Sequence, residues 1–186
     1  MKVATFLLLL AAVLPAAGAA AGGRGQVEKE NRVQLADGRV SFVPPAGFKP
    51  MSKEDIAFKF GRNGAAYAPD IVYSNERQNV SVAIKLAPAR VEPGQLDDFQ
   101  KAMEAALEQS IPRLEWLLRE QVTVKGIRWV RLSSKGAAVD TEVYSDMYLT
   151  PFGDKVLMFN FNSTAAEYER HREALKKSAE TISVKP

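Results

Sequence analysis

Five oxygen-bearing side chains alternate along one segment in the second half of the chain: Asp140, Glu142, Tyr144, Asp146 and Tyr148. Side chains two residues apart on a β-strand point to the same face, so these five would form one row. Carboxylates in a row could hold Ca²⁺, which prefers several oxygen ligands, or could supply an acid and a base for hydrolysis. The spacing therefore makes this strand face the first candidate site.

The same row has a second interpretation, because carboxylates two residues apart on a straight strand lie about 6–7 Å apart, which is loose for one ion. The acids of an exposed strand face can instead be neutralised by cations on neighbouring strands. Candidates for that role are Arg128, Arg131 and Lys85. The row is then a solvated face or a surface that binds a partner.

Other residues add little chemistry. The sequence Thr150-Pro151-Phe152-Gly153 predicts that Phe152 lies at an exposed turn tip, where it could contact a partner. Trp116 and Trp129 are interpreted as core residues, with a partner surface as the alternative. The only histidine, His171, lies between two arginines, and a lone histidine cannot complete a typical zinc site. We therefore predict no catalytic residue, no cofactor and no metal ligand.

The row needs a strand, and the second half of the chain predicts a four-stranded β meander. Turn residues at Gly126, at Lys135-Gly136 and at 151–154 separate the segments. Turns this short join antiparallel strands, because parallel strands need a long crossover. The predicted strands cover residues 119–125, 127–134, 139–150 and 155–163.

The first half predicts hairpins and helices. Residues 32–43 form a hairpin around Asp37-Gly38, and Ser52 opens a short helix that ends near residue 60. Residues 61–68 form a loop. Two further strands cover 70–75 and 79–87, and the second alternates apolar and polar residues. Apolar residues at helical spacing predict long helices from Leu96 to about Ser110 and over 165–181.

This order predicts an α+β fold with a mostly antiparallel sheet of about six or seven strands flanked by helices. The segment from Lys155 to Phe161 is apolar on both faces, which indicates a central strand covered on both sides. The predicted architecture is a three-layer α/β/α sandwich.

The N-terminus predicts export. Lys2, an apolar run over residues 3–14 and small residues up to Ala21 match a cleavable signal peptide over residues 1–21. Residues 22–31 are polar and glycine-rich, which predicts a tether before a single domain at 32–186. The apolar run is too short to span a membrane, so no stable insertion is expected after cleavage. We expect a periplasmic or secreted protein.

Composition excludes several classes of protein. The chain has no cysteine, so neither a structural disulfide nor a lipid anchor on an N-terminal cysteine can form. The net charge is only +3, and basic and acidic residues alternate. Binding of nucleic acid would favour a concentrated basic stripe, so it is not expected.

Three segments carry a likeness to a known family. Residues 40–48 form a strand followed by a Pro-x-Gly-Phe turn, residues 96–107 form a central helix, and residues 153–183 form a closing strand and helix. Over residues 33–184 the chain resembles the PsbP-like and Mog-type superfamily, and within it the exported DcrB-like bacterial proteins. The resemblance implies an antiparallel sheet between helices and an accessory or binding role. DcrB-like proteins are typically lipoproteins, whereas this chain lacks the required cysteine.

The leading expectation is an exported, soluble, non-enzymatic accessory or binding protein of the bacterial envelope, with an unidentified protein or envelope component as its partner. Its expected interaction surface comprises the alternating row and Phe152. The alternative is a Ca²⁺-dependent module or a small hydrolase centred on Asp140, Glu142 and Asp146. Convergence of these three carboxylates in a pocket would favour the alternative, and pairing of each with a cation would count against it.

Overall fold

The computed structural model describes residues 31–61, 68–138 and 140–185. These residues form ten strands, three α-helices and one 3₁₀ turn. The strands are β1 (Val33–Leu35), β2 (Val40–Phe42), β3 (Lys49–Pro50), β4 (Ile71–Ser74), β5 (Val80–Ala87), β6 (Glu115–Val124), β7 (Ile127–Ala137), β8 (Glu142–Phe152), β9 (Lys155–Thr164) and β10 (Ser183–Val184). The helical elements are α2 (Lys53–Phe60), η3 (Pro93–Gln95), α3 (Leu96–Ser110) and α4 (Ala165–Glu180).

Two sheets organise the strands. The larger sheet has seven strands in the order β3-β4-β5-β9-β8-β7-β6, and the smaller has three in the order β1-β2-β10. Every pairing is antiparallel. The α+β fold class predicted from the sequence is confirmed.

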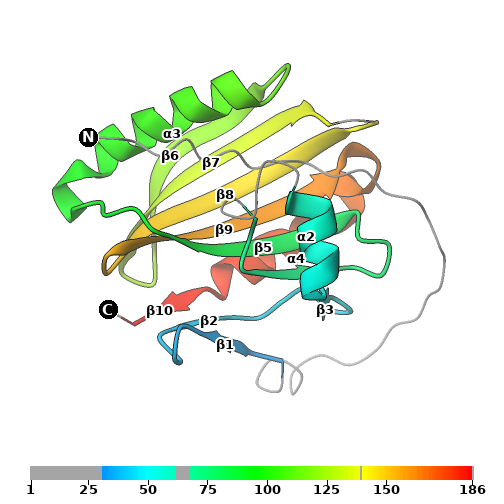
Figure 1. The fold of residues 1–186 in the computed structure, drawn as a ribbon, viewed down its shortest axis with the longest axis horizontal. Coiled ribbons are helices and arrows are strands. Elements are labelled where there is room, and N and C mark those ends of the chain that lie inside the picture. Colours follow the sequence, from blue (N-terminus) through cyan, green and yellow to red (C-terminus); the bar gives the residue numbers. More distant parts are fainter. Residues whose placement is uncertain (1–30, 62–67, 139, 186) are drawn as a thin grey trace.

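Helices cover both faces of the large sheet (Figure 1). On one face α3 packs Leu96, Met103 and Leu107 against β7, β8 and β9, and α2 packs on the β4–β5 end. On the other face α4 and the small sheet pack against β5, β8 and β9 around Phe159 and Trp129. The long strands are β6 to β9, and β8 and β9 pair over their whole length. The helices and the large sheet therefore form three layers, and α4 lies on the face of the sheet that carries the predicted row.

Strand β9 has the central position that its sequence predicts. It pairs with β5 on one side and β8 on the other. Six successive side chains, from Val156 to Phe161, are buried. Side chains on its two faces enter different cores, with Phe159 facing α4 and Met158 facing α3. A strand that is apolar on both sides is stable only where both faces are covered.

Most of the predicted loop over residues 61–68 lies outside the described residues, and the neighbouring described elements of the first half are close to their predicted positions. The β1–β2 hairpin forms, but its loop spans residues 36–39 rather than two residues, because Ala36, Asp37 and Gly38 all adopt positive φ. Ser52 caps α2 by accepting a hydrogen bond from the Asp55 backbone N–H at 3.0 Å. Strands β4 and β5 lie within one residue of their predicted bounds.

The predicted turn at Lys135-Gly136 is wrong. Both residues belong to β7, which continues to Ala137, and Ala137 pairs with Glu142 at the start of β8. Gly136 serves close packing: a Cβ there would lie 2.4 Å from Ile111 Cγ2, so no larger residue fits. Consequently β8 starts at Glu142, and Asp140 lies in the turn instead of on the strand.

The predicted turn over residues 151–154 is also too long. Pro151 and Phe152 pair with Val156 and Lys155 at the end of β8, which leaves Gly153-Asp154 as a two-residue loop. Phe152 is only 6% exposed, because its ring packs into the core with Trp129. The aromatic residue predicted at an exposed tip is therefore a core residue.

Three strand features escaped prediction. Strand β6 begins at Glu115, four residues earlier than expected, and short strands β3 and β10 form by pairing with distant partners. The predicted signal peptide and most of the tether lie outside the described residues. Within the described part of the chain, no helix combines the length and the apolar character needed to cross a membrane.

Candidate functional site

A groove opens beside α4 on the face of the sheet that carries the predicted row. Its volume is about 330 Å³, close to the lower limit of typical ligand sites. We call it the α4 groove, and its lining comes from β7, β8, β9 and α4: Arg131, Ser133, Tyr144, Ser145, Asp146, Phe161, Ser163, Tyr168, Arg172, Glu173, Leu175 and Lys176.

A bidentate ion pair forms part of the lining. Arg131 donates to Asp146 through Nε at 3.0 Å and Nη2 at 2.9 Å, and its Nη1 lies 3.3 Å from Glu120. The hydrogen bond with Asp146 is the main reason that the pKa of Arg131 lies above its ordinary value. Both oxygens of Asp146 are thus engaged, and its charge is neutralised within the protein.

Two stacked phenols link the sheet to the helix. The rings of Tyr144 on β8 and Tyr168 on α4 are nearly parallel, with centroids 3.8 Å apart. Burial is the largest cause that raises the pKa of Tyr168, and the Asp146 carboxylate acts in the same direction. The Tyr168 hydroxyl therefore stays protonated at neutral pH and can donate a hydrogen bond.

The helix supplies charge at the rim. Tyr168, Arg172 and Lys176 are four residues apart, so they form one row along α4. Arg172 pairs through Nε with Glu169 at 3.1 Å on the outer surface, where both side chains are more than half exposed. Such surface pairs are weak and exchange readily with other partners.

The carboxylates predicted to act together do not converge. Glu142 lies 2.8 Å from Lys135 Nζ, and this hydrogen bond is the main cause that raises the pKa of Lys135. Asp146 pairs with Arg131, and Asp140 lies in the preceding turn. Glu142 and Asp146 are four residues apart on one strand, or roughly 13 Å. Among the described residues, no three His, Cys, Asp or Glu side chains are grouped so that they could hold a metal ion.

The cations that neutralise the row are only partly those predicted. Arg131 has this role, and Lys135 joins it. Arg128 instead donates to Gln121 on the α3 side, and Lys85 is buried on that side and donates to the Ala68 carbonyl at 2.6 Å. Strand alternation explains the difference. The side chains of Arg128 and Lys85 point to the α3 face of the sheet, whereas the row points to the α4 face.

The remaining two predicted residues face the core. Tyr148 is 7% exposed and packs edge-on against Trp129, and burial is the main cause that raises its pKa. Phe152 lies under the Arg39 guanidinium, 4.4 Å from its ring centroid, at a second cleft of about 600 Å³. This cleft is lined by Arg39, Arg90, Val91, Glu92, Ile127, Pro151, Phe152, Gly153, Asp154 and Val184.

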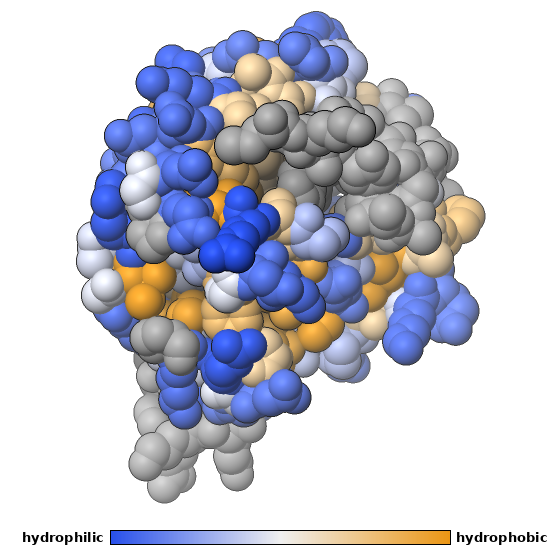
Figure 2. Space-filling view, turned by 60° about the vertical axis from the view of Figure 1, so that its left-hand side comes forward, coloured by the Kyte–Doolittle hydropathy of each residue, from blue (hydrophilic) through white to orange (hydrophobic). Residues whose placement is uncertain are grey.

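The surface of the molecule does not show one large apolar patch in the view of Figure 2, where apolar areas are interrupted by hydrophilic side chains. Small separated patches of this kind are normal for protein surfaces and do not by themselves indicate an interface.

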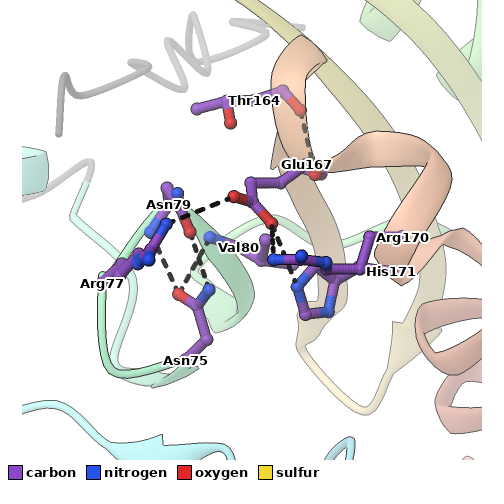
Figure 3. Close-up of polar contacts among 9 residues, drawn as sticks. Asn75, Arg77, Asn79, Val80, Thr164, Glu167, Arg170 and His171 are labelled. Carbon is purple, nitrogen blue, oxygen red and sulfur yellow. Dashed lines mark hydrogen bonds and ion pairs between the residues drawn. The ribbon is translucent and has the colours of Figure 1, made fainter. Parts of the chain in front are cut away.

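A second polar cluster lies at the start of α4. Figure 3 shows the Glu167 carboxylate between Arg77, from the β4–β5 hairpin, and Arg170 and His171 of its own helix. The distances are 3.8 Å to Arg77, 3.5 Å to Arg170 and 3.4 Å to His171 Nε2. Asn75 orders the same hairpin by accepting from the Asn79 and Val80 backbone N–H groups. The cluster joins the hairpin to the helix.

Two of the residues that line the α4 groove are among the site residues predicted from the sequence. Tyr144 and Asp146 were predicted as surface residues of the row, and both line it. For the helix over 165–181 the sequence predicts Tyr168 on the buried stripe and Arg172 and Lys176 on the exposed face, with no function for any of the three. Their spacing of four residues was a usable indication that they share a face, but only the tertiary structure shows that this face borders the row.

Comparisons with known proteins show the fold. No family model and no curated protein matches the chain by sequence. The chain is similar in structure to cyanobacterial PsbP (CyanoP) from Synechocystis sp. PCC 6803, with 15% identity, a TM-score of 0.59, and coverage of 88% of this chain and 98% of that one. It is also similar to LpqN, involved in cell envelope biogenesis of Mycobacterium tuberculosis, with 14% identity, a TM-score of 0.55, and coverage of 86% and 95%. The resemblance predicted from the sequence is confirmed at the level of the fold, which is that of the PsbP-like proteins.

Proposed function

We propose that the chain is an exported accessory protein that binds a component of the bacterial envelope through the α4 groove and catalyses no reaction. The observation that carries the proposal is the state of the groove's charges. Asp146 is already neutralised by Arg131, whereas the aromatic and cationic row of α4 borders open space. A catalytic carboxylate must be available to take up or release a proton, while a binding groove needs shape and donors.

Two further observations support this proposal. LpqN, which shares the fold, takes part in cell envelope biogenesis. The first 21 residues have the charge, apolar run and small residues of a signal peptide. Fold likeness alone assigns no function, so the groove and the leader are the features to test.

The export part is tested by cell fractionation and N-terminal sequencing. The expected product is an extracytoplasmic protein that begins close to Gly22. A control variant with Leu8→Arg and Leu9→Arg interrupts the apolar run, so it should stay in the cytoplasm with Met1 or Lys2 at its start. A native chain that keeps Met1 would contradict export by cleavage.

The binding part is tested by site-specific photocrosslinking in envelope extracts. A photoreactive residue at position 173, which is exposed and lines the groove, should give a discrete adduct. The control position is Lys101, which is exposed on α3 on the opposite face of the sheet. Identical adducts from both positions, or none from position 173, would contradict binding through the α4 groove.

A further inference from the structure

Some polar groups that line the α4 groove already have partners within the protein, and others do not. Arg131 donates to both oxygens of Asp146 and also contacts Glu120, so neither Arg131 nor Asp146 is available to a ligand. Ser145 donates to Asn160, and Ser163 to the Thr164 carbonyl. These groups shape the groove and hold it rigid, which leaves recognition to the remaining side chains.

The unused groups are mostly hydrogen-bond donors. Among the described residues, the hydroxyls of Ser133, Tyr144 and Tyr168 form no hydrogen bond, and Lys176 forms no ion pair. Arg172 uses only Nε for Glu169, which leaves its two Nη groups for another partner. Phenols, an ammonium and a guanidinium at one site present many N–H and O–H donors toward the same space.

Acceptors are fewer. Glu173 is the one acid lining the α4 groove that has no cationic partner within the described residues. It precedes Lys176 by three residues on α4, so it lies next to Lys176 at the side of the row formed by Tyr168, Arg172 and Lys176. A neutral apolar ligand would leave the donors unpaired, which is costly, whereas a ligand with several acceptor oxygens would satisfy them.

Resting on the proposed binding function, we infer that the α4 groove recognises an oxyanion of its ligand, a carboxylate or a phosphate group. Arg172 and Lys176 supply the charge, and the Tyr168 hydroxyl supplies a neutral donor in the same row. Charge-assisted hydrogen bonds of this kind are stronger than neutral ones. The oxyanion belongs either to a soluble molecule or to a lipid headgroup, and the two sources share the same chemistry.

The test is a titration of the exported protein with acetate, with inorganic phosphate and with vesicles, followed by amide chemical shifts for the soluble ions and by co-sedimentation for the vesicles. The vesicles contain phosphatidylglycerol, and vesicles of phosphatidylcholine alone serve as the neutral control. Lys176→Gln should weaken binding about tenfold. The matched control is Lys177→Gln, which removes the same charge from an exposed neighbouring residue outside the groove lining.

Binding of a soluble ion, or of phosphatidylglycerol vesicles only, supports the inference and identifies the source of the oxyanion. Equal losses in Lys176→Gln and Lys177→Gln would overturn it, since they would show attraction by net charge alone. Equal binding to both kinds of vesicle, or no binding to any probe, would also overturn it. Crosslinking from position 173 that persists without oxyanion binding leaves the proposed function standing and rejects only this inference.

Discussion

The two halves of helix α4 use charge in opposite ways. At its start, Glu167 is one acid surrounded by three basic groups and only 13% exposed, so the cluster is closed (Figure 3). Farther along, Arg172 and Lys176 border open space with no buried acid between them. The comparison teaches that the number of charges does not identify a binding site. Whether the protein itself satisfies those charges does.

The ion pair of Arg131 with Asp146 forms the closed floor of the α4 groove, because the protein itself satisfies both charges. The first way to test the comparison is to break this pair. Arg131→Met leaves Asp146 and Glu120 without their cation, and should lower the free energy of unfolding by about 2–3 kcal/mol. Urea denaturation measures this loss. Arg128→Met is the control, because Arg128 is exposed on the other face and should change stability by less than about 0.5 kcal/mol. Similar losses in both variants would show that the pair with Asp146 has no special weight.

The second way is to remove the acid of the closed cluster. Glu167→Gln removes the charged carboxylate that Arg77, Arg170 and His171 all contact, and should lower the free energy of unfolding by about 1–2 kcal/mol. Crosslinking from position 173 should stay unchanged. Glu169→Gln on the same helix removes an acid that is 78% exposed, so its effect should stay below about 0.5 kcal/mol. A loss of crosslinking in Glu167→Gln would mean that the two halves of α4 act together.

A third prediction concerns the pH dependence of stability near the β4–β5 hairpin, which carries Arg77 of the closed cluster. Lys59 of α2 donates to the Gln78 carbonyl of the same β4–β5 hairpin. Burial lowers its pKa to about 8, and Asp55 offsets part of this effect. The unfolded chain, with a pKa near 10.5, binds this proton more tightly, so stability should rise with pH above about 8.

The expected size of this effect is about 1 kcal/mol between pH 8 and pH 9.5. It is measured as the difference in unfolding free energy between wild type and Lys59→Met, which cannot titrate at this position. Lys53→Met at the exposed start of α2 is the control and should keep the wild-type pH dependence. Parallel curves for wild type and Lys59→Met would disprove the link between Lys59 burial and stability.

Local sequence patterns predict most of the helices and strands, whereas the contacts between these elements are visible only in the tertiary structure. The capping of α2 by Ser52 and the buried stripe of α3 follow from residue spacing, and both are present. Gly136 was taken for a turn, because nothing local shows that Ile111 lies against it. Phe152 was placed at a tip for the same reason, since its contact with the core depends on distant residues.

The candidate site shows the same division. Alternation placed Tyr144 and Asp146 on one face of β8 correctly, because strand geometry is local. It could not identify Arg131 as the partner of Asp146, which depends on the register between β7 and β8. Nor could it place Tyr168 on Tyr144, because that contact depends on where α4 crosses the sheet.

The smallest expected effect is that of calcium. Glu142 and Asp146 each have a cationic partner and lie roughly 13 Å apart along β8, so an ion would have to displace two cations to reach both. A ligand that binds only the folded state raises the melting temperature, so millimolar Ca²⁺ should leave it within about 1 °C. A larger rise that Glu142→Gln and Asp146→Asn both abolish would restore the calcium module. A rise that survives both substitutions would place the ion elsewhere and leave the closed floor of the α4 groove as described.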